Sequence, residues 1–152
     1  MPKGDLSITL DQTEYNALMR KLDQLDTVQK ATAVQKGLQA GASIIRKRGR
    51  ASLRRVLSTK PSNVKQRTGN LLSSIASRTY KKKGKSHIGF GKKGHHAHLV
   101  DTGTKERYTS TGARRGKMPG NRFWRKNFEA NRNKARDEIF NGVDRYLRKI
   151  WR

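Results

Sequence analysis

The sequence predicts an α+β protein with two N-terminal helices, a small antiparallel β-sheet with a basic hairpin, and a long C-terminal helix. Two observations support this fold class. Apolar residues recur at helical spacing near both ends of the chain, and two short strand-like segments flank a lysine-rich turn in the middle. With 152 residues and no internal repeat, residues 1–152 are expected to form a single domain.

The N-terminal segment predicts a strand followed by a helix. Residues 6–10 alternate apolar and polar side chains, which is typical of a short strand with one apolar face. Asp11 stands three residues before Glu14, the spacing of a capping box, and apolar residues follow at helical spacing. A helix is therefore expected over residues 12–25.

A second, longer helix is expected over residues 28–57. Its apolar stripe consists of Val34, Leu38, Ala42, Ile45, Leu53 and Val56. Three glycines, Gly37, Gly41 and Gly49, would each weaken this helix by about 1 kcal/mol relative to alanine. Such small residues either let another helix pack closely or mark a bend.

The rest of the chain predicts a β-hairpin and a last helix. After a polar linker at 58–66, strands are expected at 72–80 and 86–91, with Lys81–Lys85 as an exposed tip between them. Residues 94–104 are expected to connect the hairpin to a mobile, basic, Gly-rich loop over 105–121. The final helix is expected over 121–150.

The charge of the chain is far from balanced. The net charge is +25, whereas a small soluble domain carries roughly 2–8 charges. Residues 27–100 contain eighteen Lys and Arg and no Asp or Glu, residues 1–26 carry a net −2, and residues 101–152 a net +9. Positive charge at this density repels itself, so a polyanion, most often a nucleic-acid backbone, is expected near the protein.

Composition excludes several other classes. There is no Cys, which excludes a disulfide framework and thiol chemistry. No apolar run approaches a membrane span, and the N-terminus lacks the apolar stretch of a signal peptide, so no membrane partner is expected. The apolar fraction of 32% predicts a thin core that neighbouring subunits would help to order.

The segment Leu99-Val100-Asp101-Thr102-Gly103 carries the Asp-Thr-Gly signature of aspartic proteases. Such enzymes are nearly all β and need two carboxylates that share a proton, whereas both ends of this chain predict helices. The basic surroundings would also keep Asp101 ionised. We therefore interpret the segment as a turn in which Asp101 accepts backbone hydrogen bonds and Gly103 supplies an unusual φ.

No other pattern predicts catalysis. His95, His96 and His98 lack the spacings of known metal sites, and the glycines of residues 89–94 do not form a P-loop. The chain is therefore expected to be no enzyme and to need no cofactor. Trp124 could stack on a base, but its spacing with Phe123 and Phe128 favours a core or interface position.

The order of the motifs is more specific than any one of them. A helical pair precedes Thr68-Gly69-Asn70-Leu71, then come Ile88-Gly89-Phe90-Gly91, Val100-Asp101-Thr102-Gly103-Thr104, and Pro119-Gly120-Asn121-Arg122-Phe123 before the last helix. Over roughly residues 15–150 this order resembles the neck or tail-completion proteins of long-tailed bacteriophages, of the minor tail protein Z type. The sequence departs from that pattern at His96-Ala97-His98 and at Arg122-Phe123-Trp124-Arg125.

The resemblance implies a structural virion protein, assembled in the host cytoplasm. Such proteins form a ring between the connector and the tail terminator or tail tube, and help join the tail to the DNA-filled head. A hexamer is favoured over a dodecamer, and double-stranded DNA would pass through the lumen. The resemblance also makes Thr68, Gly69, Asp101, Gly103 and Thr104 structural turn residues.

The positions of the Lys and Arg residues predict which part of the chain contacts the partner. We expect DNA or a neighbouring ring to contact the following residues: Lys81, Lys82, Lys83, Lys85, Arg114, Arg115, Lys117, Arg46, Arg50 and Arg54. The sequence shows no recognition helix with Asn or Gln set for base edges, so any DNA contact would go to phosphates. Acidic patches on adjacent rings are the competing partner. The alternative function is a free, sequence-nonspecific nucleic-acid-binding protein.

Overall fold

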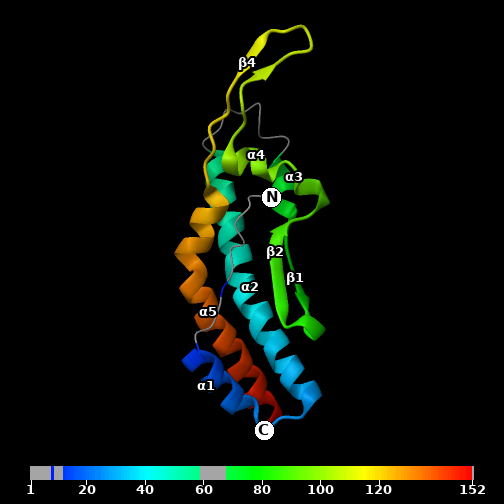
Figure 1. The fold of residues 1–152 in the computed structure, drawn as a ribbon, viewed down its shortest axis with the longest axis vertical. Helices are drawn as coiled ribbons and strands as arrows, with labels where there is room; N and C mark the ends of the chain where they lie inside the picture. The colour runs from blue at the N-terminus through cyan, green and yellow to red at the C-terminus, as the bar shows by residue number, and fades with distance from the viewer. Residues whose placement is uncertain (1–7, 9–11, 59–67, 152) are drawn as a thin grey trace.

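The computed structural model describes residue 8, residues 12–58 and residues 68–151, and Figure 1 shows the arrangement of their elements. In chain order these are α1 (Gln12–Leu22), α2 (Thr27–Ser58), α3 (Thr68–Ser73), β1 (Ile75–Tyr80), the single turn η2 (Lys81–Lys83), β2 (Lys85–Phe90), the single turn η3 (Lys92–Gly94), α4 (Ala97–Thr102), β3 (Arg107–Tyr108), β4 (Arg114–Gly116) and α5 (Phe123–Ile150). The predicted α+β fold class is confirmed. None of the described helices is both long and apolar enough to cross a membrane.

The helix predicted over 28–57, the second strand of the hairpin and the last helix are confirmed to within two residues, and the first strand ends at Tyr80 as predicted. The helix predicted over 12–25 ends earlier, at Leu22, because the chain turns there to bury Leu25, and Asp26 accepts a hydrogen bond from the Gln29 N–H at 2.7 Å to begin α2. Except for Ile8 and Ser58, the predicted strand at 6–10 and linker at 58–66 lie outside the described residues.

Three local predictions were wrong. Residues 72 and 73, predicted as the start of a strand, belong to α3, which buries Leu71 in the core, and β1 begins only at Ile75. The connection predicted at 94–104 contains α4, which buries Ala97 and Val100. The loop predicted at 105–121 contains the antiparallel strands β3 and β4.

The long helices α2 and α5 lie against each other along most of their length (Figure 1). Every fourth residue of α2 is buried: Ala33, Gly37, Gly41, Ile45, Gly49, Leu53 and Leu57. Buried or half-buried residues recur at the same interval along α5: Phe123, Asn127, Asn131, Ala135, Ile139, Val143 and Leu147. Rows of residues four apart are the ridges by which helices interdigitate.

Glycines bring the two helix backbones together. A Cβ on Gly37 would lie 2.7 Å from the Ile139 carbonyl oxygen, and one on Gly41 would lie 2.7 Å from the Ala135 carbonyl oxygen. From the other side, a Cβ on Gly142 would lie 2.9 Å from the Cα of Gly37. Of the two interpretations of these glycines, close packing of another helix is therefore the one that the structure shows.

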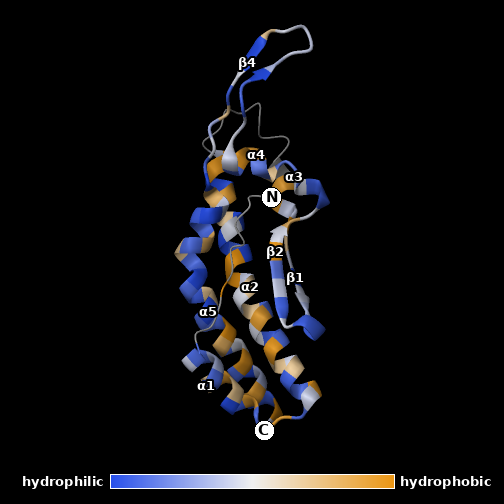
Figure 2. Ribbon diagram, viewed as in Figure 1, coloured by the Kyte–Doolittle hydropathy of each residue, from blue (hydrophilic) through white to orange (hydrophobic). Residues whose placement is uncertain are grey.

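Two separate groups of apolar residues form the core. One lies where α2 ends and α5 begins and consists of Leu53, Leu57, Leu71, Ile75, Ala97, Val100 and Phe123. The other lies where α1 crosses the far end of the helix pair and consists of Leu18, Leu22, Leu25, Ala33, Val143 and Leu147. In Figure 2 the apolar colouring of α2 and α5 accordingly concentrates on the surfaces that face other elements.

The hairpin of β1 and β2 packs along α2 (Figure 1). Its strands pair without a bulge from Ile75–Phe90 to Tyr80–Lys85. Alternate residues of β1 face α2, and between them the side chains are exposed. A bond of 3.0 Å between the Thr79 and Ser86 hydroxyls joins the strands on the inner face.

Gly41→Ala tests the close packing of α2 and α5. Helix propensity alone predicts stabilisation by about 1 kcal/mol. We expect destabilisation by about 2 kcal/mol instead, because the added methyl meets the backbone of α5 and overpacks the contact. Urea unfolding followed by circular dichroism gives the sign. The control is Gly89→Ala, where an added Cβ has no neighbour within 4 Å; a stabilised Gly41→Ala protein would contradict the packing account.

Candidate polyanion interface

Three of the predicted contact residues lie in one row on α2. Arg46, Arg50 and Arg54 are four residues apart, so their side chains leave the same side of the helix. Arg50 Nη2 donates a hydrogen bond of 2.8 Å to the carbonyl oxygen of Ile75, the first residue of β1. The row therefore lies beside the hairpin, at the end of β1 opposite to the lysine tip.

The outward face of the hairpin is basic and aromatic. Arg78 and Tyr80 point away from α2 and stand opposite His87 and Lys85 in the strand register. The Arg78 guanidinium lies 5.1 Å from the centroid of the Tyr80 ring, and that ring meets the His87 ring edge-on at 5.5 Å. A cation over an aromatic face is attracted to it, so these contacts hold Tyr80 against the sheet.

Sequence reasoning missed this face. It did not select Arg78, Tyr80 or His87 as contact residues. The signal that could have found them is the alternation of β1, since Ile75 faces inward and every second residue after it, at positions 77 and 79, shares that side.

The tip of the hairpin carries four exposed lysines. Lys81, Lys82 and Lys83 form one 3₁₀ turn, closed by a hydrogen bond from the Gly84 N–H to the Lys81 carbonyl oxygen, and Gly84 has φ 55°. Because a 3₁₀ turn has three residues, successive side chains point about 120° apart and the like charges separate. Lys85 follows as the first residue of β2.

The acidic side chains are engaged elsewhere. Ion pairs along α1 and α5 join Lys21 to Asp144, Arg136 to Glu14, Arg125 to Glu129 and Arg145 to Glu138. The hydrogen bond from Arg145 lowers the pKa of Glu138 below its ordinary value, and the hydrogen bond to Glu129 raises the pKa of Arg125. Among the described residues, no carboxylate pairs with the α2 arginine row or with the lysine tip.

Asp101 holds the beginning of α5. The N-cap residue of α5, Arg122, has φ 53° and its side chain makes no capping bond. Asp101 lies at the end of α4 and is 8% exposed; its Oδ1 accepts a hydrogen bond of 2.9 Å from the Trp124 N–H, and its carbonyl oxygen accepts one of 2.7 Å from the Arg122 N–H. A carboxylate at this position also interacts favourably with the helix dipole.

Two glycines form the root of the projecting ribbon of β3 and β4. Gly103 has φ 83° and pairs with Pro119, and a Cβ on it would lie 2.5 Å from the Met118 carbonyl oxygen. A Cβ on Gly120 would lie 2.4 Å from the carbonyl carbon of Thr102. Next to this crossing, the Thr104 N–H donates to the Met118 carbonyl oxygen at 2.9 Å, and the Met118 N–H donates to Thr104 Oγ1 at 3.0 Å.

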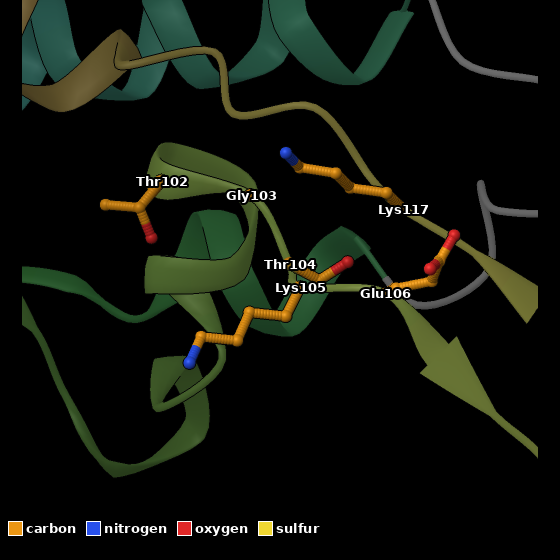
Figure 3. A pocket seen from close by; sticks show the side chains of 6 residues that line it. All are labelled: Thr102, Gly103, Thr104, Lys105, Glu106 and Lys117. Carbon is orange, nitrogen blue, oxygen red and sulfur yellow. The ribbon is translucent and has the colours of Figure 1, made fainter.

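An open hollow of about 520 Å³ lies beside this root and is lined by Thr102, Gly103, Thr104, Lys105, Glu106 and Lys117. In Figure 3 the amino groups of Lys105 and Lys117 extend away from the Glu106 carboxylate. The hollow is open to solvent, and its lining contains no pair of groups placed to transfer a proton between them.

The remaining candidates are placed as follows. Thr68 and Gly69 lie in the first turn of α3. The rings of His95 and His96 contact each other at 5.2 Å, and no group of three metal-ligating side chains occurs in the part of the chain that the structure describes. Trp124 packs beside Phe90 on the group of core residues where α2 ends and α5 begins, and it covers Gly49 of α2.

The predicted contact residues therefore fall on two surfaces. We call the first the hairpin face, made of the predicted Arg46, Arg50, Arg54, Lys81, Lys82, Lys83 and Lys85 together with Arg78, which was not predicted. We call the second the arm, residues 104–118, with Arg114, Arg115 and Lys117. Figure 1 shows the arm projecting beyond one end of the helix pair, whereas the hairpin tip points toward the opposite end.

The arrangement is that of a small α+β protein with a tightly paired helical body and two basic ribbons. Residues 16–103 match the HK97-gp10-like family, described as "Bacteriophage HK97-gp10, putative tail-component". The chain belongs to this family. No curated protein and no solved structure matches the chain significantly. The matched segment runs from α1 to Gly103 and leaves the arm and α5 outside it.

Replacing Asp101 tests its role at the start of α5. Asp101→Asn keeps an oxygen that can accept from the Trp124 N–H, so we expect a stability close to that of the unchanged protein. Asp101→Ala removes the acceptor and should destabilise the fold by about 1–2 kcal/mol. Thermal and urea unfolding of both variants measure the difference. Equal destabilisation by Asn and Ala would contradict a role through the hydrogen bond.

Proposed function

We propose that this chain is a structural virion protein of the head–tail junction. It forms a ring around the DNA channel as a neck or tail-completion protein and helps join the tail to the DNA-filled head. Membership of a bacteriophage tail-component family supports the setting. The observation that carries the DNA contact is the hairpin face, where bases from α2, β1, η2 and β2 line one hairpin and the adjoining helix and pair with no described carboxylate.

The chemistry of the hairpin face fits phosphates rather than base edges. Lysine ammonium groups on an exposed tip are hydrated, mobile charges, and they attract a polyanion without fixing its register. Specific readout of DNA would need side chains held against base edges in a groove. DNA that must move through a channel needs attraction without such readout, and counterion release supplies that attraction.

The assembly follows from the same proposal. Copies of the chain form a hexamer, with a dodecamer as the other symmetry, and the ring contacts the connector on one side and the tail terminator or tail tube on the other. The chain works as one domain in the virion after assembly in the host cytoplasm. It acts by contact and not as an enzyme, and it needs no cofactor.

A genetic experiment tests this proposal. Phage produced without the chain should yield filled heads and separate tails, and adding the purified protein to these tails should restore joining. Electron microscopy of the joined particles should show a ring at the junction. Infectious particles that form normally without the chain would exclude the proposed role.

The net charge of +25 also favours a second function, a free protein that binds nucleic acid without sequence preference. That protein would bind duplex DNA tightly as an isolated monomer and would be absent from purified virions. Mass spectrometry of purified particles separates the two functions, because a junction protein must be present at a fixed number of copies.

The lysine tip should dominate the salt dependence of DNA binding. For Lys81→Gln/Lys82→Gln/Lys83→Gln we expect the slope of log K against log salt to fall by about 2–3, since each phosphate contact contributes about 0.9. Fluorescence anisotropy with a short duplex measures the slope. The control, Lys126→Gln/Lys134→Gln/Lys149→Gln, removes the same charge from exposed positions of α5. Equal slopes for the two variants would show that DNA binding depends only on the net charge of the protein and not on the position of the lysines.

A further inference from the structure

The two ribbons of the molecule distribute their charge in opposite ways. The β1–β2 hairpin carries lysines at its tip. The arm has a tip without charge, Thr109–Ala113, and bears its bases along the two sides below the tip: Lys105, Arg107, Arg114, Arg115 and Lys117. A tip of hydroxyl and small side chains has no charge with which to attract phosphate, so the two ribbons suit different partners.

The arm is ordered by its own contacts. Glu106 accepts a hydrogen bond from Arg114 Nε at 2.6 Å across the strands and another from the Tyr108 hydroxyl at 3.2 Å. At the tip, the Thr109 N–H donates to the Ala113 carbonyl oxygen at 2.8 Å and the Ala113 N–H donates to Thr109 Oγ1 at 2.9 Å. Together with the fixed root, these bonds preorganise the ribbon, which lowers the ordering cost of binding.

Two arginines of the arm have no such partner. Arg107 lies between Glu106 and Tyr108, and strand alternation places it on the other side of the ribbon. Arg115 is the extra residue of the β-bulge in β4. Both are exposed, and neither pairs with a carboxylate in the ranges that the structure describes. Tyr108 is 60% exposed beside them.

Residue type distinguishes a protein partner from DNA. Arg and Tyr are enriched at the centres of protein–protein interfaces, whereas Lys is depleted there. A guanidinium pairs with a carboxylate through two parallel hydrogen bonds, which gives a fixed geometry. The arm presents arginine and tyrosine on a preorganised ribbon, whereas the tip of the β1–β2 hairpin presents only lysine. The arm therefore favours an acidic protein surface.

Among the described residues, a second copy of this chain offers few free carboxylates for that surface. Six described carboxylates are in ion pairs: Glu14, Asp23, Glu106, Glu129, Glu138 and Asp144. Asp26 and Asp101 accept hydrogen bonds from backbone N–H groups at helix starts. Among the described acidic residues this leaves only Asp137 without such an ion pair or hydrogen bond, which favours a different and acidic protein as the partner.

We propose that the arm docks on an acidic surface of another protein of the same assembly. Arg107 and Arg115 pair with its carboxylates, and Tyr108 packs at the centre of the contact. The proposal rests on the proposed function for the identity of the assembly, whose other members are tail proteins. It adds a division of labour in which the arm contacts protein and the hairpin face contacts DNA.

Tails purified from phage made without the chain are the probe. Cosedimentation with these tails measures protein binding, and anisotropy with a short duplex measures DNA binding. For Arg107→Glu/Arg115→Glu we expect tail binding to weaken about 10-fold or more, since the change places like, repelling negative charges at the contact. The control, Arg132→Glu/Arg148→Glu, makes the same charge change at exposed positions of α5. We expect it to keep tail binding and to match the arm variant in DNA affinity.

A photo-crosslinker at position 108, in place of Tyr108, identifies the protein that the arm touches in assembled tails. A crosslink to an acidic tail protein supports the proposal, and a crosslink to a second copy overturns it. The proposal is also overturned if Arg107→Glu/Arg115→Glu binds tails as tightly as the control variant does. It is likewise overturned if that variant keeps its tail binding but binds DNA more weakly than the control. If the unchanged protein fails to bind these tails, the proposed function fails and the docking proposal fails with it.

Discussion

The approach of α2 to α5 is the contact on which the rest of the structure depends. Because Gly37, Gly41 and Gly142 have no side chain at the contact, the two backbones lie closer than larger residues would allow. This contact sets the end of α2 beside the start of α5, where Leu53 and Phe123 share one core. At the other end it sets Ala33 beside Val143, where α1 covers both. A chain with a low apolar fraction thus gains stability from backbone-to-backbone packing.

The same arrangement sorts the charges. The acids of α1 and α5 are used in ion pairs such as Lys21–Asp144 within the helical body. Surface ion pairs of this kind each contribute little to stability. Their effect on the surface is larger, since they neutralise bases on the α5 side and leave the arginine row of α2 and the lysine tip of the hairpin without a partner among the described carboxylates. The surface that attracts an anion is therefore determined by which Lys and Arg residues the few carboxylates neutralise.

Sequence patterns predicted the elements whose periodicity is long and regular. The helices over 28–57 and 121–150 and the β1–β2 hairpin have apolar residues or turn residues at fixed spacing, and they occur where expected. The short elements α3 and α4 were missed because each depends on only two core residues, such as Ala97 and Val100, which no window of sequence singles out. The ribbon of β3 and β4 has no apolar face at all, and its order comes from Glu106, Arg114 and the glycines at its root.

The candidate surfaces were predicted in part. The bases were visible in the sequence, but their division between two surfaces was not, since Arg50 meets Ile75 only through the fold. The spacing of four along both long helices has a further consequence for how they can move. A slide of α2 by one turn would bring Ile45 to the place of Gly41, where the backbone of α5 leaves no room for a side chain. The two helices can therefore separate, but α2 cannot slide along α5 by one turn.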